Sequence, residues 1–366
     1  MKHIFDRIAN ELACQPSQVG AAVALLDDGA TVPFISRYRK EVTGGLDDSQ
    51  LRQLDERLQY LRELEARKAV VTASIDEQGK LTEDLQHQIE MADTKNRLED
   101  LYLPFKPKRR TKAQIARAAG LELLADLLVE NPDLAPEQEA HAFVNETIGV
   151  ADIKAALEGA RHILMERLSE DAELIGKLRE YLWQCGFLRV QVIAGKEGEG
   201  AKFKDYFDYE EPLTKIPSHR CLAVFRGRSA GILNLEVKAA NEPSSRSEPH
   251  PCESMVATHW HIKNKGRAAD TWLREVVRWT WRVKLLTQLE TDLFSRLREQ
   301  AECEAINVFA KNLKDLLLAA PAGPRATMGL DPGLRTGVKV AVIDGTGKLV
   351  DHGTIYPHGP KNQWQA

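Results

Sequence analysis

The stretch that decides the fold is residues 326–337, which read ATMGLDPGLRTG. Residues 328–330 are typical of a short buried strand, and Asp331 stands at the end of that strand. Pro332 and Gly333 favour a tight turn, because proline presets φ and glycine tolerates positive φ. The stretch therefore predicts a strand whose end presents one carboxylate.

Two further strands are predicted directly after it. Residues 337–343 form a second apolar run, and residues 344–347 read DGTG, which is a strong hairpin signal. Residues 348–355 then form a third run. We therefore predict a three-stranded meander over residues 326–356.

Three stretches carry a resemblance to a known family. Residues 329–337 are similar to the opening of a YqgF or RuvC-like domain, residues 98–110 read LEDLYLPFKPKRR, and residues 31–46 read TVPFISRYRKEVTGGL. In their order along the chain, from residues 31–46 to 329–337, they resemble the Tex family of bacterial transcription accessory proteins, over essentially the whole chain. The resemblance implies a ribonuclease H-like sheet whose first strand offers Asp331 to a divalent metal. It also implies that the rest of the YqgF domain, helix-hairpin-helix elements and an OB-fold RNA-binding domain lie beyond these residues.

Composition restricts the class of protein. The 366 residues suffice for two or three domains, and the formal net charge of −4 means that any nucleic-acid contact must use local patches. The five cysteines are widely spaced and include no Cys-x-x-Cys pair, which fits a reducing cytoplasm rather than a disulfide or zinc framework. No apolar run is long enough to span a membrane, and residues 1–6 contain no signal core. We expect a soluble cytoplasmic protein with no membrane partner.

Residues 1–46 predict a bundle of three short helices that resembles a helix-turn-helix. Thr31 can cap the third helix, Pro33 is tolerated in its first turn, and residues 43–45 read TGG and end it. Arg37 and Lys40 are expected to share one face of this helix, where together with Arg39 they would suit phosphate contact. The alternative is a small bundle with a solvated basic face, since short helical hairpins are common.

A second basic region reads KPKRRTK and spans residues 106–112. Its five cations are Lys106, Lys108, Arg109, Arg110 and Lys112. Thr111 and Gln114 can form a capping box, so the run is expected to be a loop that leads into a helix N-terminus, and both features attract phosphate. The alternative is a solvated loop whose cations pair with acids such as Glu99 and Asp100.

The region between these landmarks has a mainly helical pattern. Residues 48–79 predict one helix of roughly 30 residues, or about 45 Å, and Asp270 begins another long helix with three tryptophans near its start. A further helix is predicted at residues 305–319. Alternating apolar and polar residues predict short strands near residues 188–194 and 231–238.

These elements define the predicted fold class, which is mainly α. Residues 1–46 form the helix-turn-helix-like bundle, and residues 47–325 form a multi-helical region with long helices and a few short strands. Residues 326–366 are the truncated start of a YqgF or ribonuclease H-like α/β domain, of which the first three-stranded meander is present.

Four histidine and cysteine residues near position 255 are candidate metal ligands. His250, Cys252, His259 and His261 match no zinc spacing, so we expect neither a metal nor another cofactor in this chain. In a complete domain, Asp331 would be the position that admits Mg²⁺. The aromatic residues at 203–209 are interleaved with acids as well as cations, so we expect them to pack on the core rather than to stack with bases.

Three functions stay open. The first, which we favour, is a transcription accessory factor that binds single-stranded RNA or DNA and has the transcription machinery as a further partner. The second is a metal-dependent nuclease or resolvase in a longer protein, which needs several carboxylates around two ions about 4 Å apart. Because residues 356–366 contain no acid, Asp331 would be a vestigial or incomplete catalytic residue and this chain no enzyme by itself. The third is a helical scaffold for protein contact.

Overall fold

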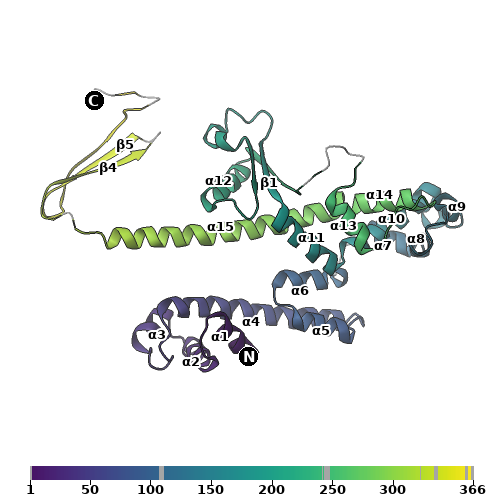
Figure 1. The fold of residues 1–366 in the computed structure, drawn as a ribbon, viewed down its shortest axis with the longest axis horizontal. Helices are drawn as coiled ribbons and strands as arrows, with labels where there is room; N and C mark the ends of the chain where they lie inside the picture. Colours follow the sequence, from purple (N-terminus) through teal and green to yellow (C-terminus); the bar gives the residue numbers. More distant parts are fainter. Residues whose placement is uncertain are drawn as a thin grey trace. The chain divides into compact units, whose positions relative to one another are not determined.

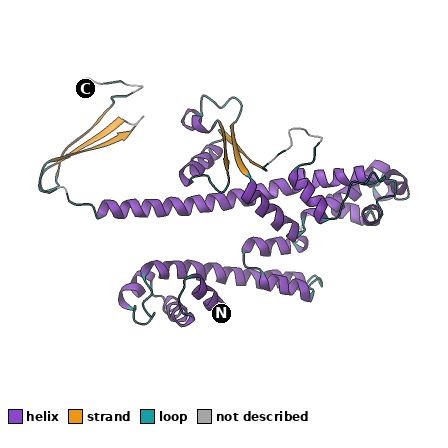
Figure 2. Cartoon of the chain, in the orientation of Figure 1, coloured by secondary structure: helices purple, strands orange, loops and turns teal. Residues whose placement is uncertain are grey.

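The computed structural model of the chain divides into two compact units, residues 1–298 and 299–366 (Figure 1). The residues that it describes are 2–106, 111–240, 242, 248–321, 323–333, 337–358 and 362–363. Helices make up most of the chain, and two small sheets interrupt them (Figure 2). The predicted fold class is confirmed. Within the described ranges, no helix combines the length and the hydropathy that crossing a bilayer requires.

The N-terminal bundle consists of three short helices on one long helix. They are α1 (Lys2–Glu11), α2 (Pro16–Asp27), α3 (Val32–Tyr38) and α4 (Asp48–Asp76). A capping box starts α4: Asp47 accepts a hydrogen bond from the Gln50 backbone N–H, and the Gln50 side chain accepts one from the Asp47 N–H. From there a buried leucine stripe, Leu51 to Leu64, runs along α4 and forms the bundle core with the short helices.

The end of α3 differs from the prediction. The helix stops at Tyr38, so Lys40 lies beyond it and does not share a helical face with Arg37. The chain turns because Thr43 and Leu46 are buried, while Gly44 and Gly45 take φ values of 61° and 93° that reverse its direction.

A series of shorter helices follows. They are α5 (Glu83–Met91), α6 (Lys95–Tyr102), the 3₁₀ turn η1 (Leu103–Phe105), α7 (Lys112–Ala118), α8 (Glu122–Glu130), α9 (Pro136–His141), the 3₁₀ turn η2 (Glu146–Ile148), α10 (Ile153–Ser169) and α11 (Ala172–Cys185). The central member is α10, which contacts α7, α8 and α9 through buried residues that include Ile163 and Leu164.

The first sheet has the strand order β2-β1-β3 and is antiparallel. Its strands are β1 (Phe187–Val192), β2 (Asp208–Pro212) and β3 (Leu233–Lys238), with η3 (Ala201–Tyr206) before β2 and α12 (Ser218–Ser229) before β3. The two predicted strands are present. The strand β2 was not predicted, because it is an edge strand with the polar sequence DYEEP and lacks apolar alternation.

The last helical segment also differs in detail. After α13 (Pro251–His259), α14 (Asp270–Trp279) continues through the π-helical turn η4 (Thr280–Leu285) into α15 (Leu286–Leu317). The helix predicted at residues 305–319 is therefore not separate, because residues 298–305 are mostly good helix formers and nothing breaks the chain there. The π turn buries Trp281 and leaves Trp279 exposed, so the tryptophans are only partly core.

The second sheet is the predicted meander, with strand order β4-β5-β6. Its strands are β4 (Thr327–Gly333), β5 (Gly337–Ile343) and β6 (Leu349–Ile355), all antiparallel. Two details of the prediction are wrong. Pro332 and Gly333 continue β4 instead of forming a turn, since they pair with Val338 and Gly337, and the connection falls on residues 334–336, outside the described part. Met328 and Leu330 are 63% and 61% exposed rather than buried, because their face of the sheet is uncovered within the described residues.

Candidate nucleic-acid interface

The helix α3 separates two kinds of side chain. Val32 and Ile35 are buried against the bundle core, whereas Phe34 is 42% and Tyr38 is 64% exposed. The rings of Phe34 and Tyr38 lie four residues apart in sequence and 5.4 Å apart between centroids, at an angle of 44°. The Arg39 guanidinium lies 5.8 Å from the centre of the Phe34 ring. An aromatic pair and a cation therefore share one exposed surface.

The predicted cations at this surface do not form ion pairs with nearby acids. Arg37, Arg39 and Lys40 are exposed, and none of them forms an ion pair with another residue in the described ranges. The pKa of Asp48 is lowered chiefly by a hydrogen bond from Arg52, and only to a smaller degree by the charge of Arg37. The three positive charges therefore remain available to a ligand.

Other arginines of the same bundle behave differently. Arg52 pairs with Asp48 at 2.8 Å, and Arg57 pairs with Glu11 at 2.6 Å. Arg62 and Asp27 form two hydrogen bonds of 2.7 Å each. The availability of the cations at the end of α3 and on the following turn is therefore a local property and not a general feature of the bundle.

Hydrogen bonds within the turn and from α2 anchor the turn that carries Arg39 and Lys40. The Gly45 N–H donates to the Lys40 carbonyl at 2.9 Å, and the buried Thr43 hydroxyl donates to the same carbonyl at 3.2 Å. From α2, the Gln18 amide donates to the carbonyls of Thr43 and Gly44 at 3.3 and 2.7 Å. These bonds fix the backbone, so the exposed side chains project from a defined surface.

The second basic region is described only at its ends. Lys108, Arg109 and Arg110 lie outside the described residues. The predicted capping box is present, with Thr111 accepting from the Gln114 N–H and the Gln114 side chain accepting from the Thr111 N–H. Lys106 lies 3.8 Å from Glu99, an acid that is already bonded to Arg67 at 2.7 Å, and Lys112 makes no ion pair with a described residue. Asp100, the other acid that we expected to neutralise this loop, is bonded to Arg179 instead.

Asp331 stands apart from other carboxylates. It lies in β4 opposite Lys339, whose ammonium is 3.7 Å from its carboxylate, and its side chain is exposed. The strand register places Asp351 on the opposite face of the sheet. Asp344 accepts hydrogen bonds from the Thr346 hydroxyl and from the Thr346 and Lys348 N–H groups, which lower its pKa. Among the described residues, no three metal-ligating side chains gather into one site.

Two of the candidate histidine ligands, His250 and His259, have structural partners. His250 accepts a hydrogen bond from the Cys252 N–H at the start of α13, and its ring stacks on Trp281 at 5.0 Å. His259 lies 2.9 Å from Asp171, the residue that caps α11. Burial raises the pKa of the Cys252 thiol, so it stays protonated.

Comparison with known proteins assigns the chain to a family. Three family models match it: Tex-like protein N-terminal domain at residues 2–76, Tex central region-like at 131–309, and Tex protein YqgF-like domain at 325–366. The chain belongs to the Tex family. Similar proteins include Protein YhgF of Escherichia coli, 59% identical over 96% of this chain and 45% of its own length. Transcriptional accessory protein Tex of Neisseria gonorrhoeae is 56% identical over 97% of this chain and 46% of its own.

A more distant relative is the human S1 RNA-binding domain-containing protein 1, which is 27% identical over 92% of this chain and 34% of its own length. The chain thus spans about half the length, or less, of these relatives. The surface around α3 lies within the residues that match the Tex-like N-terminal domain. Asp331 lies within the residues that match the YqgF-like domain. Residues 106–112 fall between the matched ranges.

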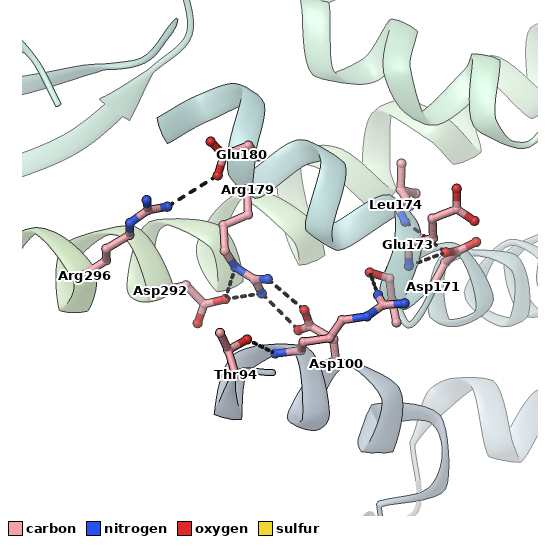
Figure 3. A network of polar contacts seen from close by, with 11 residues as sticks. Thr94, Asp100, Asp171, Glu173, Leu174, Arg179, Glu180, Asp292 and Arg296 are labelled. Atoms are coloured by element: carbon pink, nitrogen blue, oxygen red, sulfur yellow. Dashed lines mark hydrogen bonds and ion pairs between the residues drawn. The ribbon is translucent and has the colours of Figure 1, made fainter. Parts of the chain in front are cut away.

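A buried ion cluster ties the helices of the Tex-family scaffold together (Figure 3). Arg179 of α11 donates two hydrogen bonds to Asp100 of α6, at 2.7 and 2.9 Å, and two to Asp292 of α15, at 3.1 and 2.7 Å. Burial raises the pKa of the Asp100 carboxyl, although Arg179 acts in the opposite direction. These partners are 79 and 113 residues from Arg179 in sequence, so no local pattern predicted them.

The aromatic pair on α3 was also missed by sequence reasoning. A signal was present, since Phe34 and Tyr38 are separated by four residues and the cations Arg37 and Arg39 lie beside them. Helical spacing alone does not say whether such a pair faces the core or solvent. The burial of Val32 and Ile35 settles the question in favour of solvent.

Proposed function

We propose that this chain contacts nucleic acid as part of a Tex-type transcription accessory factor. The main observation is that Arg37, at the end of α3, and Arg39 and Lys40, on the turn after it, have no acidic partner among the described residues. The buried Thr43 anchors that turn. Because the chain has a net charge of −4, a polyanion must be met by such a local group of cations. The relatives' names, which mention transcription and an RNA-binding domain, support the same class of partner and favour RNA.

The mechanism would be neutralisation of phosphates. Each bound phosphate releases condensed counterions, so the affinity falls as salt rises. For a single strand, each contact contributes about −0.7 to the slope of log affinity against log salt. Contacts of this kind position the strand and carry no sequence information. The protein would therefore hold nucleic acid without reading a particular sequence.

A charge-matched pair of variants tests the proposal. Arg37→Ala/Lys40→Ala removes two charges from the proposed interface, and Lys204→Ala/Lys215→Ala removes two exposed charges elsewhere that have no ion pair with a described residue. The first variant should weaken binding to single-stranded RNA and reduce the salt slope by about 1.4. The second should leave the slope unchanged. If both variants lose the same affinity and the same amount of salt slope, the effect comes from net charge alone, and the proposed interface is wrong.

One observation favours a second candidate, the protein-contact scaffold. Ile306, Phe309, Leu313 and Leu316 are exposed along α15 at alternating spacings of three and four residues, which is the pattern of a helix-pairing seam. A partner bound there would survive nuclease treatment in a pull-down and would be lost with Phe309→Glu. A partner released by nuclease would instead be bridged by nucleic acid and would belong to the first proposal.

A further inference from the structure

We infer that the exposed pair Phe34 and Tyr38 is a stacking platform for unpaired bases, so that the α3 surface takes single-stranded nucleic acid and not duplex. The inference rests on the proposed function and adds to it the groups that meet the bases. The cations at the end of α3 and on the following turn would hold the phosphates of the same strand. We define the α3 platform as Phe34, Arg37, Tyr38, Arg39 and Lys40.

The two rings are placed as a base-binding surface requires. Both are substantially open to solvent, and their centroids lie 5.4 Å apart, so that a base can lie on either ring without first opening the core. Flat aromatic surfaces accept any base, since every base has a π face. Aromatic side chains normally bury their area, and two exposed rings on one short helix leave that area available to a ligand.

Charge complementarity selects a nucleic acid as the occupant. A peptide that covered only the rings would leave three cations unmatched, because Arg37, Arg39 and Lys40 have no acidic partner in the described part of the chain. The Arg39 guanidinium lies 5.8 Å from the Phe34 ring centre, so the cation and the stacking surface adjoin each other. A strand whose bases alternate with phosphates satisfies both groups together.

The geometry of α3 argues against a duplex. A helix that reads the major groove presents hydrogen-bonding side chains from its first turns to base edges. The first turn of α3 offers Val32, Pro33 and Phe34, whose side chains cannot hydrogen bond a base edge. The helix has seven residues and ends at Tyr38. In a duplex the bases are stacked on each other and their faces are closed to Phe34 and Tyr38, whereas in a single strand they are free.

The test compares four ligands of about twelve nucleotides, which is within the range that single-strand binding sites cover. They are oligo-U, oligo-dT, a strand of the same length with abasic sites, and a duplex. The abasic strand retains the phosphates and lacks the faces that stack. The variants are Phe34→Leu/Tyr38→Leu, which keeps apolar bulk without a ring, and Tyr38→Phe, which keeps the ring. Both positions are exposed, so the fold should tolerate all of these changes.

We expect the native chain to bind oligo-U or oligo-dT at least about fivefold more tightly than the abasic strand for each ring engaged. The double leucine variant should lose this preference and bind all four ligands alike, while Tyr38→Phe should keep it. The ratio of the affinities for oligo-U and oligo-dT then shows whether the platform prefers RNA or DNA, and either preference supports the platform.

Three outcomes would overturn the inference. If the double leucine variant keeps its preference for bases over abasic strand, the rings do not stack bases, although the proposed function stands. If the duplex binds as tightly as the single strands and loses affinity with the same leucine changes, the selectivity for single strands is wrong. If the native chain binds none of the four ligands even at low salt, both the inference and the proposed function fall.

Discussion

Arg179 and Arg37 both lie on helices of the N-terminal unit, yet their charges serve opposite purposes. Arg179 is held inside by four hydrogen bonds to two carboxylates, whereas Arg37, with Arg39 and Lys40, faces solvent without an ion pair to any described residue. An arginine whose charge is matched within the fold can only stabilise that fold. Unmatched cations add little stability and remain free for a ligand. The difference separates residues that build the protein from those that we propose for its function.

The largest expected effect is on stability. Arg179→Ala leaves Asp100 and Asp292 facing each other with Asp100 buried, and loss of one partner from a buried ion pair typically costs about 3–5 kcal/mol. The free energy of unfolding, measured with urea, should fall by that order. Arg179→Met combined with Asp100→Leu removes the guanidinium and the buried carboxylate, leaves only the partly exposed Asp292 charged, and should recover part of the loss. An Arg179→Ala protein of unchanged stability would show that the cluster is not structural.

The second prediction concerns the basic run at residues 106–112. Lys108→Ala/Arg109→Ala/Arg110→Ala should weaken binding to single-stranded RNA uniformly across sequences and reduce the salt slope by about 2, since three phosphate contacts are lost. The unfolding midpoint should not move, because none of these residues is needed by the capping box at Thr111. If the affinity and the slope stay at their native values, this basic run is not part of the interface.

The third prediction uses pH to distinguish interior from exposed charges. Burial alone would raise the pKa of Asp270, but hydrogen bonds from Arg267 and from the backbone N–H groups of Arg267 and Lys265 outweigh it and lower the pKa from 3.8 to about 2. Stability from this group is therefore present above pH 3.8 and lost as the pH falls towards 2. In Asp270→Asn the unfolding free energy should depend less on pH in that window than in the native chain. An identical pH dependence in both proteins would exclude Asp270 as its source.

The smallest expected effect is at Asp331. Asp331→Asn should change neither stability nor nucleic-acid affinity, and neither protein should cleave RNA or DNA in Mg²⁺ or Mn²⁺. Its nearest described partner is Lys339, Asp351 faces away from it across the sheet, and two hard cations need about six oxygen ligands each. Cleavage that is abolished by Asp331→Asn would reverse this account and support the nuclease alternative.

Local chemistry made much of the fold predictable. The predicted capping box at Thr111 joins a side chain to a backbone group three residues away, so its sequence spacing determines it. The same holds for the turn at residues 344–347, where Asp344 bonds to its own loop. The box at Asp47 has the same spacing as the box at Thr111 but was not predicted. The division of the chain at residues 46 and 325 stays a prediction.

The features that could not be predicted depend on contacts between residues far apart in sequence, or on segments that lack a recognisable apolar pattern. The bonds of Arg179 join helices far apart in sequence, and β2 is a polar edge strand that only its pairing with β1 defines. The exposure of Phe34 and Tyr38 follows from which residues of α3 the bundle core accepts, which is a property of packing. The cations Arg37, Arg39 and Lys40 were identified from their positions in and beside the third predicted helix, but their lack of acidic partners appears only in three dimensions.

The most direct test of the central claim is the salt dependence of binding. The slope of log affinity against log salt should be measured for the native chain and for Arg37→Ala/Arg39→Ala/Lys40→Ala with a single-stranded RNA, with unfolding midpoints as the check on folding. We predict that the slope decreases in magnitude by about 2, because three phosphate contacts of about 0.7 each are lost, while the midpoint stays within experimental error. A slope that matches the native value would contradict the claim that these cations bind phosphate.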